Sequence, residues 1–307
     1  PLSFLPFFTF HCSDRKALMK ILRRISVSYL MLAPTVIVLL MLGIFPLAYA
    51  LYLSTMKYNL LAPLESVVPI GAGNYVWALT NDDFWTTIQT SIIFTVVAVV
   101  SEFFLGLVLA LLATKLTRGA TIVRTLLATP LLVTPVVVSL MFKLMMEPYF
   151  GVFNYLLGFF GIPPVYWLSD ASIALLSIIL ADIWSWTPFI FLVLFAAIES
   201  IPRVQFESSS IDGATGWHQF RYIALPWITP AILVVVLIRA VDALKETDKI
   251  FNMTYGGPGF TTATLPFYIW YHGMKEWQMG ESTAMAFVLV IIINVITVLT
   301  YRVLRRR

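Results

Sequence analysis

Charged side chains interrupt the fifth apolar stretch of this chain, at positions where a lipid-facing helix carries none. The stretch covers residues 228–251, and residues 228–238 are uncharged. Four later residues fall on one stripe of a helix at about 100° per residue: Arg239, Asp242, Glu246 and Lys249. A charge inside a bilayer costs about 2.5–3.5 kcal/mol on insertion scales, so such groups pair with one another or serve a function. We expect this stripe to line a water-filled cavity, where the carboxylates accept hydrogen bonds from a polar solute and the cations donate them.

Ion pairing is the alternative interpretation of the same charges. Residues three or four positions apart on a helix pair readily, so Arg239 can pair with Asp242 and Asp242 with Lys245. Glu102 and Asp182 stand alone in the second and fourth apolar stretches, and we expect both to be buried against other helices. Both interpretations of the stripe stay open at this point.

Aromatic residues near the stripe extend the same candidate pathway. Tyr255 and Trp270 offer flat apolar surfaces on which a ring-shaped solute can stack. Aromatic side chains are equally expected as packing and interface residues in a membrane protein. We include Tyr255 and Trp270 among the candidate pathway residues, and we expect Lys143, in the third stretch, to extend its ammonium group to the outer surface.

The composition places these residues in a membrane protein. Of 307 residues, 60% are hydrophobic and only 12% are charged, against about 25% charged in soluble domains. Six apolar stretches are long enough to cross a bilayer: 27–53, 88–113, 122–146, 173–198, 228–251 and 284–303. We therefore predict an all-α polytopic membrane protein with six transmembrane helices. Its expected parts are an N-terminal cytoplasmic or interfacial segment (1–26), a transmembrane domain (27–303) with a cytoplasmic loop (199–227), and a basic cytoplasmic tail (304–307).

The distribution of basic residues predicts the orientation, because cytoplasmic loops carry an excess of Lys and Arg. With the N-terminus inside, the outer loops hold only Lys57 and Lys275. The inner segments hold Arg15, Lys16, Lys20, Arg23, Arg24, Lys115, Arg118, Arg124, Arg203, Arg221, Arg302, Arg305, Arg306 and Arg307. Both termini are therefore expected in the cytoplasm.

Several other functions lack their sequence signals. The basic residues flank apolar stretches and form no stripe with interleaved aromatics, which argues against nucleic acid. Cys12 is the only cysteine, so no disulfide can form within the chain. The three histidines have no metal-ligand spacing, and no G-x-x-x-x-G-K-[ST] sequence marks an ATP site. We expect no metal, no cofactor and no enzymatic activity in this chain.

A polar segment at 199–227 is the longest interruption in the later part of the chain. Lipid cannot solvate polar backbone, so this segment must lie in water or against protein. Pro202 favours a helix start, and Gly213 and Gly216 allow a sharp bend before a second short helix that ends near Pro226. We expect an apolar docking edge of Ile211, Ala214, Phe220 and Ile223, with polar anchors at Glu207, Asp212 and Arg221.

This segment resembles the EAA loop of permease subunits in binding-protein-dependent ABC importers. The resemblance rests on Glu207, Ser208, Ser209, Asp212, Gly213, Ala214, Phe220, Ile223, Leu225 and Pro226. Ser208 and Ser209 replace the usual Ala-Ala, which keeps the small size and lowers helix propensity slightly. Further similarity to the maltose and glycerol-phosphate permeases lies in Leu32-Ala-Pro34, Phe45-Pro46, Gly71–Tyr75, Asp83–Trp85 and Tyr255–Gly259.

The resemblance implies a multi-pass permease of the bacterial inner membrane that imports a sugar or oligosaccharide, with an acidic saccharide left open. Its implied partners are a second permease subunit, a solute-binding protein outside the membrane, and two ATPase subunits that bind ATP and Mg²⁺ and dock on the 207–226 loop. The alternative is an ion-driven secondary transporter that uses the carboxylates of the fifth stretch. Such transporters usually contain internal repeats, and this chain shows none.

Overall fold

A computed structural model describes residues 27–116 and 119–305, so the N-terminal segment expected at the interface and the last two residues of the basic tail lie outside the described residues. The chain divides into two compact units, Pro1–Leu53 and Ser54–Arg307. In the first unit, α2 (Val27–Leu39) continues through a π-helical turn, η1 (Leu40–Ile44), into α3 (Phe45–Ser54). The side chains of this helix are mostly exposed and apolar, as expected for a surface that faces lipid.

The second unit begins with small elements. A two-stranded antiparallel ribbon pairs β1 (Met56–Lys57) with β2 (Val68–Pro69) around η2 (Leu64–Ser66), and α4 (Gly73–Thr80) follows. Further short helices are α8 (Val152–Gly158), α10 (Arg203–Ile211), α11 (Gly216–Gln219), η5 (Ile250–Thr254) and α13 (Leu265–Met274). Of these, α10 (RVQFESSSI) is clearly polar, whereas α8 and α13 are largely apolar.

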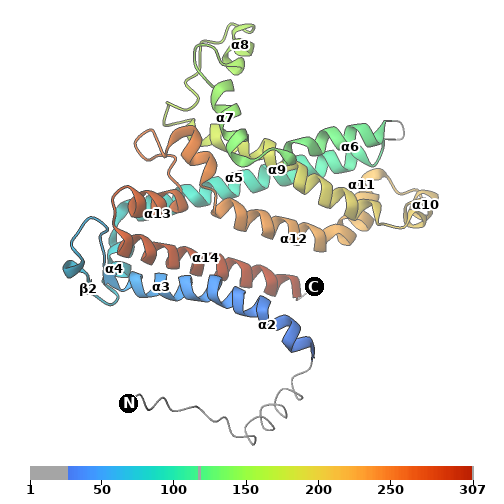
Figure 1. Ribbon diagram of the computed structural model, residues 1–307. Coiled ribbons are helices and arrows are strands. Elements are labelled where there is room, and N and C mark those ends of the chain that lie inside the picture. The colour runs from blue at the N-terminus through green and yellow to red at the C-terminus, as the bar shows by residue number, and fades with distance from the viewer. Residues whose placement is uncertain (1–26, 117–118, 306–307) are drawn as a thin grey trace, which may run out of the picture. The chain divides into compact units, whose positions relative to one another are not determined.

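Two long helices, α5 (Asp82–Ala113) and α9 (Ala174–Glu199), form the centre of the second unit and lie side by side (Figure 1). Small residues permit the close approach: a Cβ on Gly106 of α5 would lie 2.8 Å from the Ile190 side chain of α9. Such close contacts drive helix association in lipid, where apolar burial alone gives no advantage. Two buried clusters show that α5 and α9 run parallel, because Phe94 packs near Ile178 and Leu107 near Ile190.

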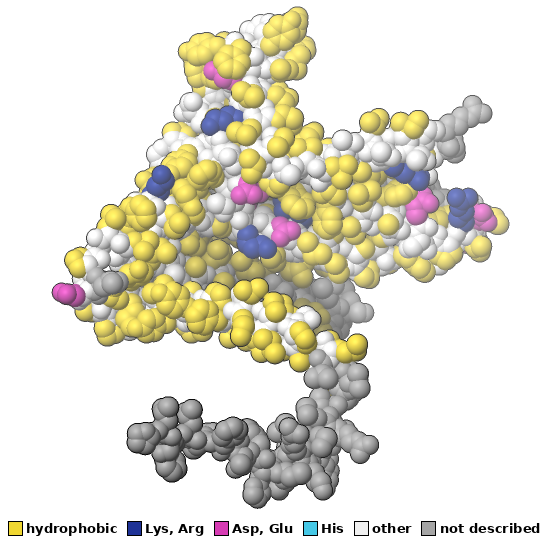
Figure 2. All heavy atoms as spheres, viewed as in Figure 1, with side chains coloured by type: hydrophobic (Ala, Val, Ile, Leu, Met, Phe, Trp, Pro, Cys, Tyr) yellow, Lys and Arg dark blue, Asp and Glu magenta, His cyan; other side chains and the backbone are white. Residues whose placement is uncertain are grey.

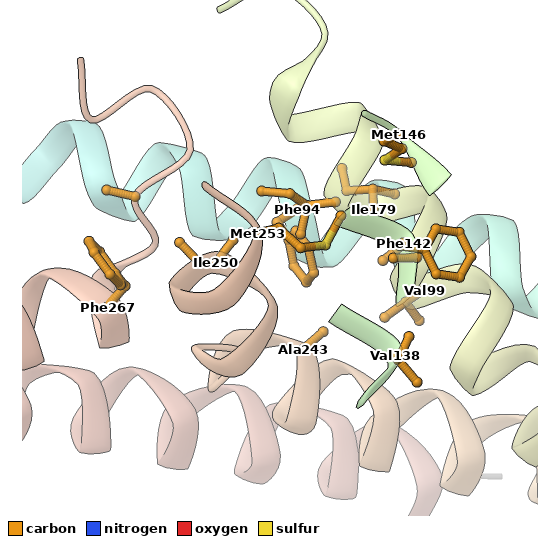
Figure 3. Close-up of a cluster of buried hydrophobic side chains, with 14 residues drawn as sticks. Phe94, Val99, Val138, Phe142, Met146, Ile179, Ala243, Ile250, Met253 and Phe267 are labelled. Carbon is orange, nitrogen blue, oxygen red and sulfur yellow. The ribbon is translucent and has the colours of Figure 1, made fainter. Parts of the chain in front are cut away.

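The helix α12 (Leu225–Leu244) runs antiparallel to this pair, since Ile228 joins the second cluster and Ala243 the first. Figure 3 shows the first cluster, to which five elements contribute Phe94, Phe142, Ile179, Met253 and Phe267. The last helix, α14 (Met279–Arg305), contributes Met285 to a third cluster with Phe84 of α5 and Tyr268 of α13. Hydrophobic side chains dominate the surface in view, and charged side chains are few (Figure 2).

The prediction of a helical, multi-pass membrane protein is confirmed. Within the described ranges, five helical segments are long and apolar enough to cross a membrane: Met31–Ser54, Asp82–Ala113, Ala174–Glu199, Gly216–Leu244 and Met279–Val298. A sixth crossing results only if a bent pair of helices is taken as one span.

The bent pair corrects the expectation of a continuous third span at 122–146. Helix α6 (Ala120–Ala128) passes into η3 (Thr129–Leu132), and α7 (Pro135–Met145) then leaves at an angle of 96°. Pro130 and Pro135 explain the break, because each lacks a backbone donor and each restricts the residue before it. The third apolar stretch is therefore two helices with a sharp turn.

The fifth stretch also differs from the expected single helix over 228–251. It begins earlier: α11 continues through the π-helical turn η4 (Phe220–Ala224) into α12, so the helix passes Pro226 without ending. It also ends earlier, at Leu244, with Lys245 as its C-cap. The expected stripe of Arg239, Asp242, Glu246 and Lys249 on one helix is therefore wrong, because Glu246 and Lys249 follow the end of α12.

Candidate functional site

The polar segment 203–224, here called the elbow, consists of α10, a turn, α11 and η4. Pro202 is the N-cap of α10 and Asp212 its C-cap. Gly213 follows with φ of +79°, a left-handed conformation that a side chain adopts only with strain. The amide of Ala214 donates to the Ser209 carbonyl at 2.9 Å, which closes the end of α10. The predicted sharp bend at Gly213 is confirmed.

Hydrogen bonds hold the two arms of the elbow together. The side-chain amide of Gln219, on α11, donates to the hydroxyls of Ser209 at 3.1 Å and Ser210 at 2.9 Å. The Ser209 hydroxyl in turn donates to the Phe206 carbonyl at 2.8 Å. An alanine at position 209, as in the usual loop, cannot accept the bond from Gln219. The serine substitution therefore adds a link between the arms that sequence analysis did not anticipate.

The expected docking edge is divided between two sides of the elbow. Ile211 is 88% exposed, and Trp217 and Tyr222 are also largely exposed. Phe220 and Ile223 instead pack in part against the second buried cluster of the chain's own helices. Glu207, Ser208, Asp212 and Gly213 are exposed, Ser209, Ala214 and Leu225 are half-buried, and Pro226 is exposed.

A shallow cavity of about 440 Å³ lies on the elbow. It is lined by Ser209, Asp212, Gly213, Ala214, His218, Gln219, Tyr222 and Ile223. Exposed apolar side chains beside a hollow are the surface that a partner's helix or groove can bury.

Most basic residues that were predicted to lie inside, and that the structure describes, are found at one end of the helix group. α5 and α9 end, and α6 and α11 begin, at the same end of the helix group (Figure 1). Arg124 of α6 donates to the Ala113 carbonyl of α5 at 3.3 Å and lies 4.0 Å from Glu199 of α9. The elbow follows Glu199 directly and so lies at this basic end of the unit.

Arg239 and Lys249 lie in a buried ion cluster with Glu102, Asp182 and Glu246. The Arg239 guanidinium donates to both oxygens of Glu102, at 2.7 and 2.8 Å, and to Asp182 at 2.6 Å. Lys249 lies 2.9 Å from Asp182 and 3.0 Å from Glu246. The side chains of Glu102, Asp182 and Lys249 are fully buried, and that of Arg239 is 1% exposed.

The cluster joins α5, α9, α12 and the segment after α12 through side chains far apart in the sequence. Its two cations and three carboxylates give a formal charge of −1, and the guanidinium also lies 4.8 Å from the Trp186 ring centre. Each buried charge has an opposite charge within 3.0 Å, as its burial requires. The expected burial of Glu102 and Asp182 against other helices is confirmed.

Asp242 is separate from this cluster. It pairs with Lys245 at 3.2 Å, and both side chains are at least one third exposed. This is one of the short-range pairs expected from spacing alone. Of the four stripe residues, Asp242 and Glu246 are therefore the ones with surface that a solute can contact, whereas Arg239 and Lys249 have almost none.

Tyr255 and Trp270 belong to an aromatic cluster that also contains Phe251, Phe267 and Tyr271. The Trp270 ring lies 4.8 Å from Phe251 and 6.0 Å from Tyr255, in both cases edge to face. Tyr255 is 42% exposed and has a positive φ of 54°. The Lys143 ammonium donates to the carbonyl of Asn252, the residue after Phe251, at 3.0 Å. The two candidate aromatics are therefore neighbours with accessible ring surface.

His272 is the functional candidate that sequence analysis missed. Its two ring nitrogens contact Glu276 and Glu281, the latter at 2.7 Å, and its ring stacks on Trp77 at 4.9 Å. Burial alone would lower the pKa of His272, but the Glu281 hydrogen bond and the two carboxylate charges outweigh burial and hold its pKa above 6.5. The spacing of four between His272, in the last turn of α13, and Glu276, just after it, was a signal that could have identified this pair.

Comparison with known proteins identifies the class of this molecule. Residues 102–307 match the family described as binding-protein-dependent transport system inner membrane component, and the chain belongs to this family. A probable ABC transporter permease of Sinorhizobium fredii is 37% identical over 90% of this chain and 89% of its own length. The trehalose/maltose transport system permease MalF of Thermococcus litoralis is 30% identical over 89% of this chain and 93% of its own length.

A solved structure agrees with these sequence matches. The crystal structure of a bacterial ABC transporter involved in the import of the acidic polysaccharide alginate contains a chain with a TM-score of 0.81 and 25% identity, which covers 94% of this chain and 99% of that one. The resemblance found in the sequence is thus confirmed: the chain is a multi-pass inner-membrane permease of the sugar-importer type. The alternative of an ion-driven secondary transporter receives no support from these matches.

Proposed function

We propose that this chain is one half of the membrane pathway of an ABC importer that moves a sugar or oligosaccharide delivered by a solute-binding protein. A second permease subunit would complete the pathway, and two ATPase subunits would bind and hydrolyse ATP with Mg²⁺. The family description and the named sugar permeases among the relatives support this assignment. The chain itself then supplies no catalytic group and binds no nucleotide.

The observation that carries the proposal is the exposed elbow at the basic end of the helix group. The positive-inside rule assigns this end to the cytoplasm, where an ATPase can reach it. Six crossings follow if the bent pair α6–α7 is one of them, and both termini are then cytoplasmic. The exposed Ile211 and Trp217 and the carboxylates of Glu207 and Asp212 supply the contact surface.

A substitution at Gly213 tests the docking assignment. Valine at φ of +79° is strained and has to change the bend between the two arms. We expect Gly213→Val to reach the membrane and to lose most solute-stimulated ATP hydrolysis in the reconstituted importer. Gly161→Val is the matched control, because Gly161 has a similar φ of +70° and open space around it but lies outside the elbow. Equal stimulation in both variants would refute the assignment.

We propose that the translocation pathway is lined by the accessible residues at the C-terminal end of α12 and by the aromatic cluster. Asp242 and Glu246 would accept hydrogen bonds from sugar hydroxyls, and Tyr255 and Trp270 would stack on sugar rings. Arg239 and Lys249 would act indirectly, by holding Glu246 and the helices in place.

We propose that the solute is a saccharide, either neutral or acidic. The relatives and the solved structure include a trehalose/maltose permease and an importer of acidic alginate. Competition of a labelled neutral oligosaccharide with a uronate oligosaccharide in uptake assays separates the two classes.

A further inference from the structure

A second cavity, distinct from the elbow and from the aromatic cluster, lies at the opposite end of α5. Its volume is about 250 Å³, and we call it the outer pocket. It is lined by Trp77, Asn81, Asp83, Thr86, Thr87, Phe260, Tyr268, His272 and Glu276. These residues come from α4, the N-cap and first turns of α5, the loop before α13, α13 itself and the turn that follows it. Under the orientation proposed above, this end faces away from the cytoplasm.

The walls of the outer pocket are aromatic and are fixed in position. His272 stacks on Trp77 at 4.9 Å and on Tyr268 at 5.7 Å, and its nitrogens are occupied by Glu276 and Glu281. The Thr86 and Thr87 hydroxyls donate to backbone carbonyls of their own helix. The pocket therefore presents ring surfaces and carboxylates to an occupant, with few free donors.

The pocket carries an excess of negative charge. Asp83 and Glu276 line it, Glu281 lies next to it on His272, and no Lys or Arg lines it. Even with His272 protonated, these three carboxylates leave a formal charge of −2. Within the part of the chain that the structure describes, no side chain pairs with Asp83, which is exposed. Burial and the charges of Asp83, Glu276 and Glu281 raise the pKa of Tyr268 to about 12, so its phenol stays protonated.

Aromatic rings combined with uncompensated carboxylates favour an organic cation. Such a cation gains charge-assisted hydrogen bonds from carboxylates and attraction from the ring faces. A neutral sugar can use the rings but gains nothing from the net charge, and an acidic sugar is repelled. Within the described residues, no group of three or more His, Cys, Asp or Glu side chains can hold a metal ion.

We propose that the outer pocket receives a lysine or arginine side chain of the solute-binding protein when that protein docks on the permease. This inference rests on the importer function proposed above. Complementary charge at a docking surface raises the association rate and fixes the orientation of the partner. A basic side chain that enters an aromatic pocket also has the composition typical of residues that dominate binding at interfaces.

The test uses the assembled importer in lipid nanodiscs and the solute-binding protein that stimulates the wild-type ATPase. Asp83→Asn removes one charge of the pocket and retains its shape, and Asp83→Lys reverses that charge. Asp82→Asn is the matched control, since Asp82 is also exposed in the first turn of α5 but does not line the pocket.

We expect the half-saturating concentration of binding protein to rise about tenfold in Asp83→Asn and further in Asp83→Lys, and to stay unchanged in Asp82→Asn. The difference between wild type and Asp83→Asn should shrink as salt rises from 50 to 500 mM, as expected for a charge interaction.

Other results would overturn the inference. Equal half-saturating concentrations in the Asp83 and Asp82 variants would show that the pocket does not bind the partner. A lower saturating rate at an unchanged half-saturating concentration would show that the pocket binds the solute instead. A wild-type importer that no solute-binding protein stimulates would refute the importer assignment itself, which is a distinguishable outcome.

Discussion

Removal of Arg239 should be among the most destabilising single substitutions in this chain. Arg239→Met deletes three hydrogen bonds of 2.6–2.8 Å and leaves Glu102 and Asp182 with Lys249 as their only buried cation. The charge of the cluster then changes from −1 to −2 among side chains that are almost fully buried. Loss of one partner from a buried ion pair costs about 3–5 kcal/mol. At about 2–3 °C per kcal/mol for a large domain, the unfolding midpoint should fall by about 6–15 °C.

A double-mutant cycle isolates the reason for this loss. Glu102→Leu alone should cost less than Arg239→Met, because Arg239 retains Asp182 at 2.6 Å. The double variant Arg239→Met with Glu102→Leu restores the charge of −1 and leaves Asp182 paired with Lys249, so it should recover at least half of the Arg239→Met loss.

The assay is thermal unfolding of the purified protein in detergent, followed by aggregation or tryptophan emission. Lys245→Met is the control, because its pair with Asp242 is exposed and should contribute about 1 kcal/mol or less. Equal midpoints for Arg239→Met and Lys245→Met, or a double variant no more stable than Arg239→Met, would show that the cluster does not hold the helices together.

Three further predictions concern orientation, pH and the pathway. After removal of Cys12, a cysteine at Ser208 should resist an impermeant label on intact cells while one at Glu65 reacts; the reverse pattern would invert the proposed topology. Because the pKa of His272 is raised on folding, its contribution to stability is present below pH 6.5 and is lost as pH rises through the folded-state pKa. The thermal midpoint should therefore fall across that range, and His272→Gln should flatten the curve; an equal slope in both proteins would refute this. Trp270→Ala should lower solute uptake about tenfold and leave stimulation by the binding protein detectable; unchanged uptake kinetics would remove Trp270 from the pathway.

The elbow was predictable because its signals are local. Pro202, Gly213 and the small residues between them specify a helix, a left-handed residue and a second helix without reference to the rest of the chain. The break at Pro130 and Pro135 had a local signal too, since two prolines five positions apart restrict the backbone on both sides of a short segment. Its angle of 96° depends on packing and had no such signal.

The arrangement of charges was not predictable in the same way. Helical periodicity places Arg239 near Asp242, but its actual partners are Glu102 and Asp182, which are 137 and 57 positions away. The stripe also assumed that the helix continues beyond Leu244, and no Pro or Gly between Lys245 and Lys249 marks the actual end. The cost of desolvation decides which partners Arg239 takes, because a buried guanidinium must be paired with carboxylates. Those carboxylates lie on α5 and α9, whose positions the local sequence does not specify.

The unbroken helical run from Gly216 to Leu244 has a mechanical consequence. Its 29 residues form a rod about 43 Å long, and a tilt of about 5° at one end displaces the other by about 4 Å. One end of the rod is the second arm of the elbow, and Arg239, near the other end, is clamped to α5 and α9. We therefore expect a push on the elbow to turn α12, α5 and α9 together as one block. The compliant point is the wide turn of η4, inside the elbow, whereas the chain after Leu244 should move with the block, because buried Lys249 pairs with Asp182 of α9 at 2.9 Å.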